Sequence, residues 1–138
     1  MQAHGHCPVL VVDDDESIRE TLVAILQDEG YPTVGAQHGG EALDLLRRAE
    51  PMPCLILLDL MMPVMDGGAF RCLQLGDPSL ASIPVVVISA YHDVEEQARA
   101  LHPSGTLKKP MQLEALIAMV KKFCDKCGPR ADGPQAIA

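Results

Sequence analysis

The chain has 138 residues, of which 48% are hydrophobic and 22% charged, the balance of one ordinary globular domain. A formal net charge of −8 and scattered Lys and Arg argue against direct binding of nucleic acid, which usually needs a basic patch. The apolar runs are too short to cross a membrane, the first residues lack the pattern of a signal peptide, and five cysteines at irregular spacing form no regular disulfide framework, so we expect a cytoplasmic protein.

The first half of the chain predicts three strands and two helices. The β-branched run at 9–12 predicts a buried strand, and apolar residues at helical spacing predict a helix that follows it and stops at Gly30. A weaker strand is expected at 32–36 and a second helix at 39–50. The third strand, at 54–59, is strongly apolar and ends in an acid.

The second half continues the alternation. A short helix is expected at 67–75, a fourth strand at 85–90, a fourth helix at 93–101, a fifth strand within 105–110 and a fifth helix at 111–123. Strands that alternate with helices predict β-α-β units, and continuous apolar strands fit a parallel sheet that is covered on both faces. The sequence therefore predicts an α/β fold.

The two ends of the chain are expected to lie outside this folded domain. Residues 124–138 lack apolar periodicity and carry Gly and Pro. We therefore expect a flexible N-terminus at 1–7, one folded domain at 8–123, and a flexible tail or the start of a linker at 124–138.

Polar side chains follow four of the five expected strands. Asp13 and Asp14 come after the first strand, and Asp59 ends the third. Ser89 ends the fourth strand and Lys109 the fifth. Because ligands of open α/β sheets bind beyond the carboxyl ends of the strands, where strand order reverses, we expect these five side chains to lie together.

The chemistry of this set is typical of phosphoryl transfer. Three carboxylates at one edge repel one another, by roughly 3 kcal/mol for each pair at about 5 Å and an effective dielectric of about 20. Such a cluster favours a cation, and oxygen ligands with room for water suit Mg²⁺. With a lysine and a hydroxyl nearby, Asp59 would be the nucleophile that forms an acyl phosphate.

Four segments in this order resemble the receiver domains of response regulators in bacterial two-component signalling. They are VVDDD (11–15), LLDLMMPVMDG (57–67), VISA (87–90) and KKP (108–110), and the resemblance covers residues 8–123. It implies a flavodoxin-like, doubly wound α/β fold with five parallel strands in the order 2-1-3-4-5. It also implies a phosphoacceptor that switches a protein-binding surface rather than an enzyme with turnover.

The resemblance assigns roles around the acceptor. Asp59 would take a phosphoryl group from the phosphohistidine of a sensor histidine kinase or phosphotransfer protein. Asp14, Asp59 and the backbone carbonyl of Met61 would bind Mg²⁺, and Asp13 would act through water. Lys109 would pair with Asp59 and later hold a phosphoryl oxygen.

The resemblance also suggests how the signal is transmitted. Ser89 would swing in to hydrogen-bond the phosphoryl group, and Thr106 stands where the family usually has an aromatic residue that moves with it. A downstream protein is expected to bind the fourth helix, fifth strand and fifth helix. Whether Thr106 transmits the movement of Ser89 to this surface in the usual way stays open. Met61 and Tyr91 are bulky and lack groups that position water, so we expect slow self-dephosphorylation. The kinase is expected to dock around Asp15, Ile18, Pro110 and Met111.

Two other functions stay open. Asp13-x-Asp15-x-Ser17 looks like the nucleophile motif of haloacid-dehalogenase-type phosphatases, which predicts steady turnover of small phosphoesters. Alternatively, a receiver that no longer switches would serve as a constitutive docking or dimerisation module. The switching receiver would be a monomer or a phosphorylation-linked dimer.

The cysteines allow one more interpretation. Cys124 and Cys127 form a C-x-x-C that topology brings to the same end of the sheet as His4, His6 and Cys7, so a zinc or redox site is sterically allowed. We expect flexible, unpaired termini instead. Two further cysteines are expected to be small core residues: Cys54 and Cys72.

Overall fold

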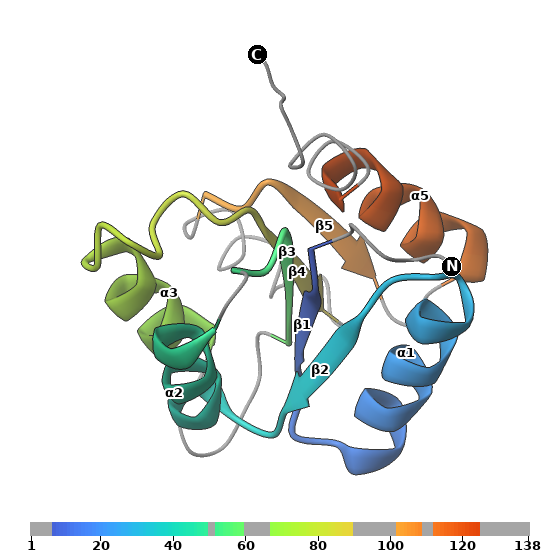
Figure 1. Ribbon diagram of the computed structural model, residues 1–138, viewed down its shortest axis with the longest axis horizontal. Helices are drawn as coiled ribbons and strands as arrows, with labels where there is room; N and C mark the ends of the chain where they lie inside the picture. Colours follow the sequence, from blue (N-terminus) through green and yellow to red (C-terminus); the bar gives the residue numbers. More distant parts are fainter. Residues whose placement is uncertain (1–6, 50–51, 60–66, 90–101, 109–111, 125–138) are drawn as a thin grey trace.

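Five parallel strands form one sheet in the order β2-β1-β3-β4-β5 (Figure 1). This order and the flavodoxin-like α/β fold confirm the sequence prediction. The strands are β1 (Val9–Val12), β2 (Thr33–Ala36), β3 (Leu55–Asp59), β4 (Val85–Ser89) and β5 (Gly105–Lys108). A computed structural model describes residues 7–49, 52–59, 67–89, 102–108 and 112–124.

Four helices are described, and they cover both faces of the sheet. In Figure 1, α1 and α5 lie to the right of the sheet, and α2 and α3 lie to the left. The fourth helix expected at 93–101 lies outside the described residues. The described helices are α1 (Glu16–Asp28), α2 (Gly39–Arg48), α3 (Gly67–Leu75) and α5 (Leu113–Cys124).

Alternate residues of each central strand enter two separate cores. Leu10 of β1 and Ile56 of β3 pack with Leu46 of α2 on one face of the sheet. Val11 of β1 packs with Leu116 of α5 on the other face. Both strands are fully buried, as expected for a sheet covered on both sides. Their carboxyl ends therefore stand on a rigid support.

The helix ends differ little from prediction. Asp15 caps α1 by accepting a hydrogen bond from the Ile18 amide at 3.1 Å, and Gly30 ends the α1 segment with a φ of +96°, a conformation that glycine adopts readily. The helix α5 ends at Cys124 rather than at Phe123.

A buried polar network joins α3 to the loops before β4 and β5. The side-chain nitrogen Nε2 of Gln74 donates to the carbonyl oxygens of Leu80 and Ile83, at 2.9 and 3.0 Å. Arg71 donates to the Gln74 side-chain oxygen at 2.8 Å and to the carbonyl oxygen of His102 at 3.0 Å. Burial lowers the pKa of the Arg71 side chain. The network fixes His102 in a left-handed conformation, with a φ of +53°.

The cysteines differ most from expectation. Cys54 is buried, as expected, but it forms a disulfide with Cys124, whose Cα atom lies 5.3 Å away. Cys72 is free and exposed on α3, so its assignment to the core is wrong. Cys7 is also disulfide-bonded, so the expectation of unpaired cysteines near both ends is wrong for Cys7 and Cys124.

Candidate functional site

Three carboxylates meet at the carboxyl edge of the sheet. Asp59 is the last residue of β3, and Asp13 and Asp14 directly follow β1. The strands are adjacent and in register, with Val12 beside Leu58, so they end side by side. One ligand oxygen from each carboxylate lies within 4.8 Å of the others. The position predicted from the strand ends is therefore confirmed for these three acids.

Their burial is unequal. Asp13 and Asp59 are 1% and 5% exposed, whereas Asp14 is open to solvent. One Asp13 oxygen accepts a hydrogen bond from the Asp15 amide at 2.9 Å. Two buried carboxylates close together are costly unless a positive charge compensates them. Oxygen ligands with one side open to water suit Mg²⁺, so the residues present fit this ion.

Within the described ranges, no other group of three His, Cys, Asp or Glu side chains has ligand atoms gathered in this way. The acidic cluster is therefore the candidate metal site of this part of the chain. Asp15 caps a helix, which accounts for it without the catalytic role that the phosphatase interpretation requires.

Arg19, which no sequence pattern singled out, holds the main chain at Asp13. Arg19 of α1 donates from Nη1 to the carbonyl oxygen of Asp13 at 2.9 Å. Its aliphatic part crosses Gly35 of β2 so closely that an added Cβ there would lie 2.9 Å from Arg19 Cγ. A glycine inside an expected strand was the available signal, because such a residue often marks a close approach.

Other predicted residues are placed by the backbone. Ser89 ends β4, the strand beside β3, where Asp59 pairs with Ile88. Thr106 lies on β5 opposite Val87, and its side chain is exposed. Asp15 and Ile18 lie at the start of α1, next to the acidic cluster in the chain. Outside the described residues are Met61, Tyr91, Lys109, Pro110 and Met111.

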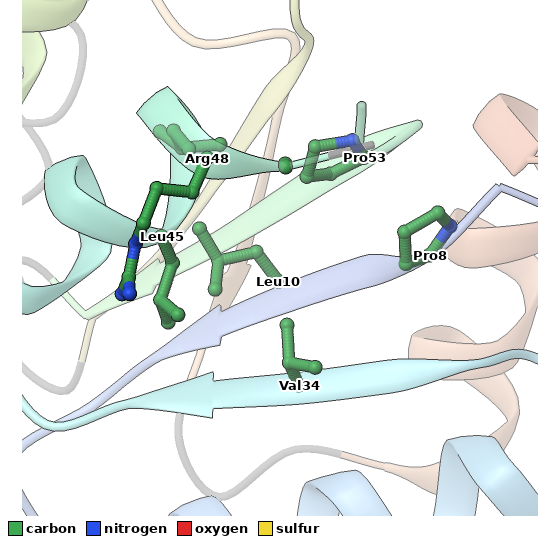
Figure 2. A pocket seen from close by; sticks show the side chains of 8 residues that line it. Pro8, Leu10, Val34, Leu45, Arg48 and Pro53 are labelled. Carbon is green, nitrogen blue, oxygen red and sulfur yellow. The ribbon is translucent and has the colours of Figure 1, made fainter. Parts of the chain in front are cut away.

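An apolar groove lies away from the acids, between α2 and the edge strand β2. It has a volume of about 330 Å³. Figure 2 shows Leu10 and Val34 on the strands, with Leu45 and Arg48 of α2 beside them. Among the described residues that line it, there is no carboxylate, thiol or imidazole to take part in phosphoryl transfer. In the described part of the chain, no helix combines the length and apolar character needed to span a bilayer.

Comparison with known proteins gives a consistent result. The family model for the response regulator receiver domain matches residues 9–121. The response regulator MprA of Mycobacterium sp. (strain KMS) is 38% identical over 135 residues, which cover 94% of this chain and 55% of the relative. An uncharacterised 14.6 kDa protein of Leptolyngbya boryana is 35% identical, with 90% of this chain and 95% of the relative covered. The chain thus spans about half the length of MprA.

Solved structures agree. The Vibrio cholerae chemotaxis protein CheY4 has a TM-score of 0.77 and 29% identity, covering 85% of this chain and 98% of that one. A response regulator receiver protein from Pseudomonas putida has a TM-score of 0.77 and 31% identity, covering 84% and 96%. The similarity thus extends over nearly the whole of both solved chains.

Proposed function

Because this chain belongs to the family of response regulator receiver domains, we propose that Asp59 accepts a phosphoryl group from the phosphohistidine of a histidine kinase or phosphotransfer protein, in a Mg²⁺-dependent reaction. Members of this family are generally signalling modules rather than enzymes. The observation that carries the proposal is the convergence of Asp13, Asp14 and Asp59 within 4.8 Å at the carboxyl edge of the sheet.

The acceptor step follows from the position of Asp59. A carboxylate oxygen of Asp59 would attack phosphorus, and an O–P bond would form as the P–N bond to the kinase histidine breaks. Asp14 and Asp59, with the Met61 carbonyl, would hold Mg²⁺, and Asp13 would act through water. When bound, Mg²⁺ would offset the charge of these carboxylates and of the incoming phosphoryl oxygens. Lys109 would hold one of those oxygens.

The output would be a change in a protein-binding surface. Ser89 would hydrogen-bond the phosphoryl group, and the fourth helix, β5 and α5 would present the changed surface to a downstream protein. Thr106 is small and exposed on β5, so it supplies no aromatic ring for the usual movement. A receiver that docks without switching therefore remains the alternative.

The kinase and the lifetime of the phosphorylated state belong to the same proposal. The start of α1, with Asp15 and Ile18, is exposed or half-buried beside the acidic cluster and would form part of the kinase contact, together with Pro110 and Met111. Met61 and Tyr91 would leave no group to position water, and the aspartyl phosphate would hydrolyse slowly.

Intact mass spectrometry after incubation with acetyl phosphate and Mg²⁺ tests the acceptor. We expect the mass of one phosphoryl group to be added to the wild type and to Asp44→Asn, a control at an exposed acid of α2. We expect no addition to Asp59→Asn, or to the wild type in excess chelator. Labelling of Asp59→Asn would contradict the acceptor assignment, and no labelling of the wild type by acetyl phosphate or a phosphorylated kinase would favour the docking module.

A further inference from the structure

The disulfide between Cys54 and Cys124 joins the start of a central strand to the end of a helix. Cys54 directly precedes β3, and Cys124 is the last residue of α5. They are 7% and 0% exposed, in the core that α1 and α5 form with the sheet. Phosphoryl-acceptor chemistry does not use them, because Cys54 lies at the opposite end of β3 from Asp59.

The surroundings of Cys54 suit a reduced thiol as well as a disulfide. Its sulfur lies 3.3 Å from the carbonyl oxygen of Cys7 and 3.4 Å from that of Pro8. A disulfide sulfur has no proton to donate, but a thiol could donate to either oxygen. The Cys54 amide also donates to the Pro8 carbonyl at 2.9 Å. Cys54 can therefore stay in place, with a hydrogen-bond acceptor, when the bond is broken.

Cys124 lies in the last turn of α5. The last turn of a helix has carbonyl groups without partners inside the helix, and helix ends open at low free energy. Opening this turn of α5 would expose the Cys124 sulfur to a thiol reagent, while the sheet and its hydrogen bonds remain intact. Access to the buried bond would then require local opening of this turn rather than global unfolding.

We propose that Cys54 and Cys124 form a redox-active thiol–disulfide pair that fixes the end of α5 when oxidised and releases it when reduced. In oxidation, the Cys124 thiolate attacks a low-molecular-weight disulfide and displaces one thiol. The Cys54 thiolate then attacks the Cys124 sulfur of this mixed disulfide, displaces the second thiol and closes the bond. The pair loses two electrons and two protons, and the oxidant leaves as two thiols.

The consequence for signalling rests on the proposed function. There, α5 is part of the surface that binds the downstream protein, so an oxidant would bias the same surface as phosphorylation does. The redox pair itself does not depend on phosphoryl transfer, and the two proposals can fail separately.

Peptide mapping identifies the pair. Trypsin cleavage leaves Cys54 in peptide 49–71 and Cys124 in peptide 123–126. Cys127 falls in the next peptide, so Cys124 and Cys127 are analysed separately. The protein is equilibrated in glutathione buffers, and its free thiols are then alkylated. We expect these two peptides to pass reversibly from free to cross-linked as the fraction of oxidised glutathione in the buffer rises. The cross-link should be absent from Cys54→Ala and Cys124→Ala. It should be unchanged in Cys72→Ser, a control at a free, exposed cysteine.

Hydrogen exchange of the wild-type protein measures the effect on α5 and avoids variants that fail to fold. Amides in the last turn of α5 should exchange at least about tenfold faster in the reduced protein, because the covalent anchor is lost. Amides of α3, which has no residue in the bond, should exchange equally in both states.

Three results would overturn the inference. In the first, glutathione does not reduce the cross-link until the whole protein unfolds. In the second, both thiols stay reduced at every ratio of oxidised to reduced glutathione. In the third, one equivalent of zinc protects both thiols from alkylation. Acetyl phosphate labelling of the same samples reports the proposed function independently, so its failure is distinguishable from failure of the redox pair.

Discussion

The candidate site places two buried acids close together. Asp13 and Asp59 are almost completely buried, and their ligand oxygens lie within 4.8 Å. Two negative charges at this separation repel, and the repulsion is less screened than at the surface. Residues that serve a ligand commonly destabilise the protein in its absence.

Replacing one of these acids should therefore stabilise the metal-free protein. For Asp59→Asn, we expect the free energy of unfolding in chelator to rise by about 1–2 kcal/mol, because a neutral amide of similar shape removes the repulsion. Urea denaturation with and without Mg²⁺ measures this. The wild type should gain stability on adding Mg²⁺, and the variant should gain much less. Asp44→Asn should behave as the wild type, and a less stable Asp59→Asn in chelator would refute the argument.

Arg19 and Gly35 form the second feature at this scale. The Arg19 guanidinium holds the main chain at Asp13, and Gly35 leaves the space for the arginine stem. The two residues thus help to position the acidic cluster through the backbone of Asp13.

Gly35→Ala should weaken Mg²⁺ binding. The added Cβ would lie 2.9 Å from Arg19 Cγ, so the arginine must shift and its bond to Asp13 lengthens. We expect the Mg²⁺ dissociation constant, measured by isothermal titration calorimetry, to rise by roughly threefold to tenfold, which corresponds to about 1 kcal/mol. Gly76→Ala is the matched control, since its nearest contact would be an ordinary 3.4 Å. Equal effects in both variants would contradict the role of Arg19.

At the scale of elements, α3 is held by polar contacts as well as apolar ones. Phe70, Arg71 and Gln74 are buried on one side of this helix, while Cys72 and Leu73 face solvent. A buried arginine and glutamine are uncommon, and here each is hydrogen-bonded. The helix thereby fixes the loops that lead into β4 and β5.

Gln74→Met should therefore be strongly destabilising although it conserves volume. It removes the donor for two buried carbonyl oxygens and the acceptor for Arg71. We expect a loss of about 2–4 kcal/mol in the free energy of unfolding, measured by chemical denaturation, because each unsatisfied buried group costs about 1–3 kcal/mol. Gln112→Met, at an exposed position before α5, should change it by less than about 0.5 kcal/mol. Similar losses in both variants would argue against the network.

For the whole molecule, the fold could be predicted because local patterns carry it. The apolar runs that become β1, β3 and β4 and the helical spacing of α1 and α2 are visible in short windows of sequence. The acidic cluster was predictable for a related reason. Once strands are parallel, residues at their carboxyl ends share an edge, and the strand order that the resemblance implies brings Asp13, Asp14 and Asp59 side by side on it.

The missed features depend on where a helix lies on the sheet and which way it faces. The buried face of α3 includes the polar residues Arg71 and Gln74, so no apolar pattern shows that Cys72 lies on the exposed face. The pairing of Cys54 with Cys124 requires the end of α5 to reach the start of β3, which no local pattern reports. The contact of Arg19 in α1 with Gly35 in β2 likewise depends on the direction in which the arginine side chain points.

The covalent link from α5 to β3 also has a mechanical consequence. β3 is the central strand of the sheet, with β1 and β4 on its two sides. Without the link, tension on the chain beyond Cys124 would peel α5 away from the sheet, one turn at a time. With the link, the same tension passes directly into β3 at its amino end, where hydrogen bonds to two neighbouring strands share the load. In the oxidised protein, α5 is thus no longer the first described element that a pulling force would remove.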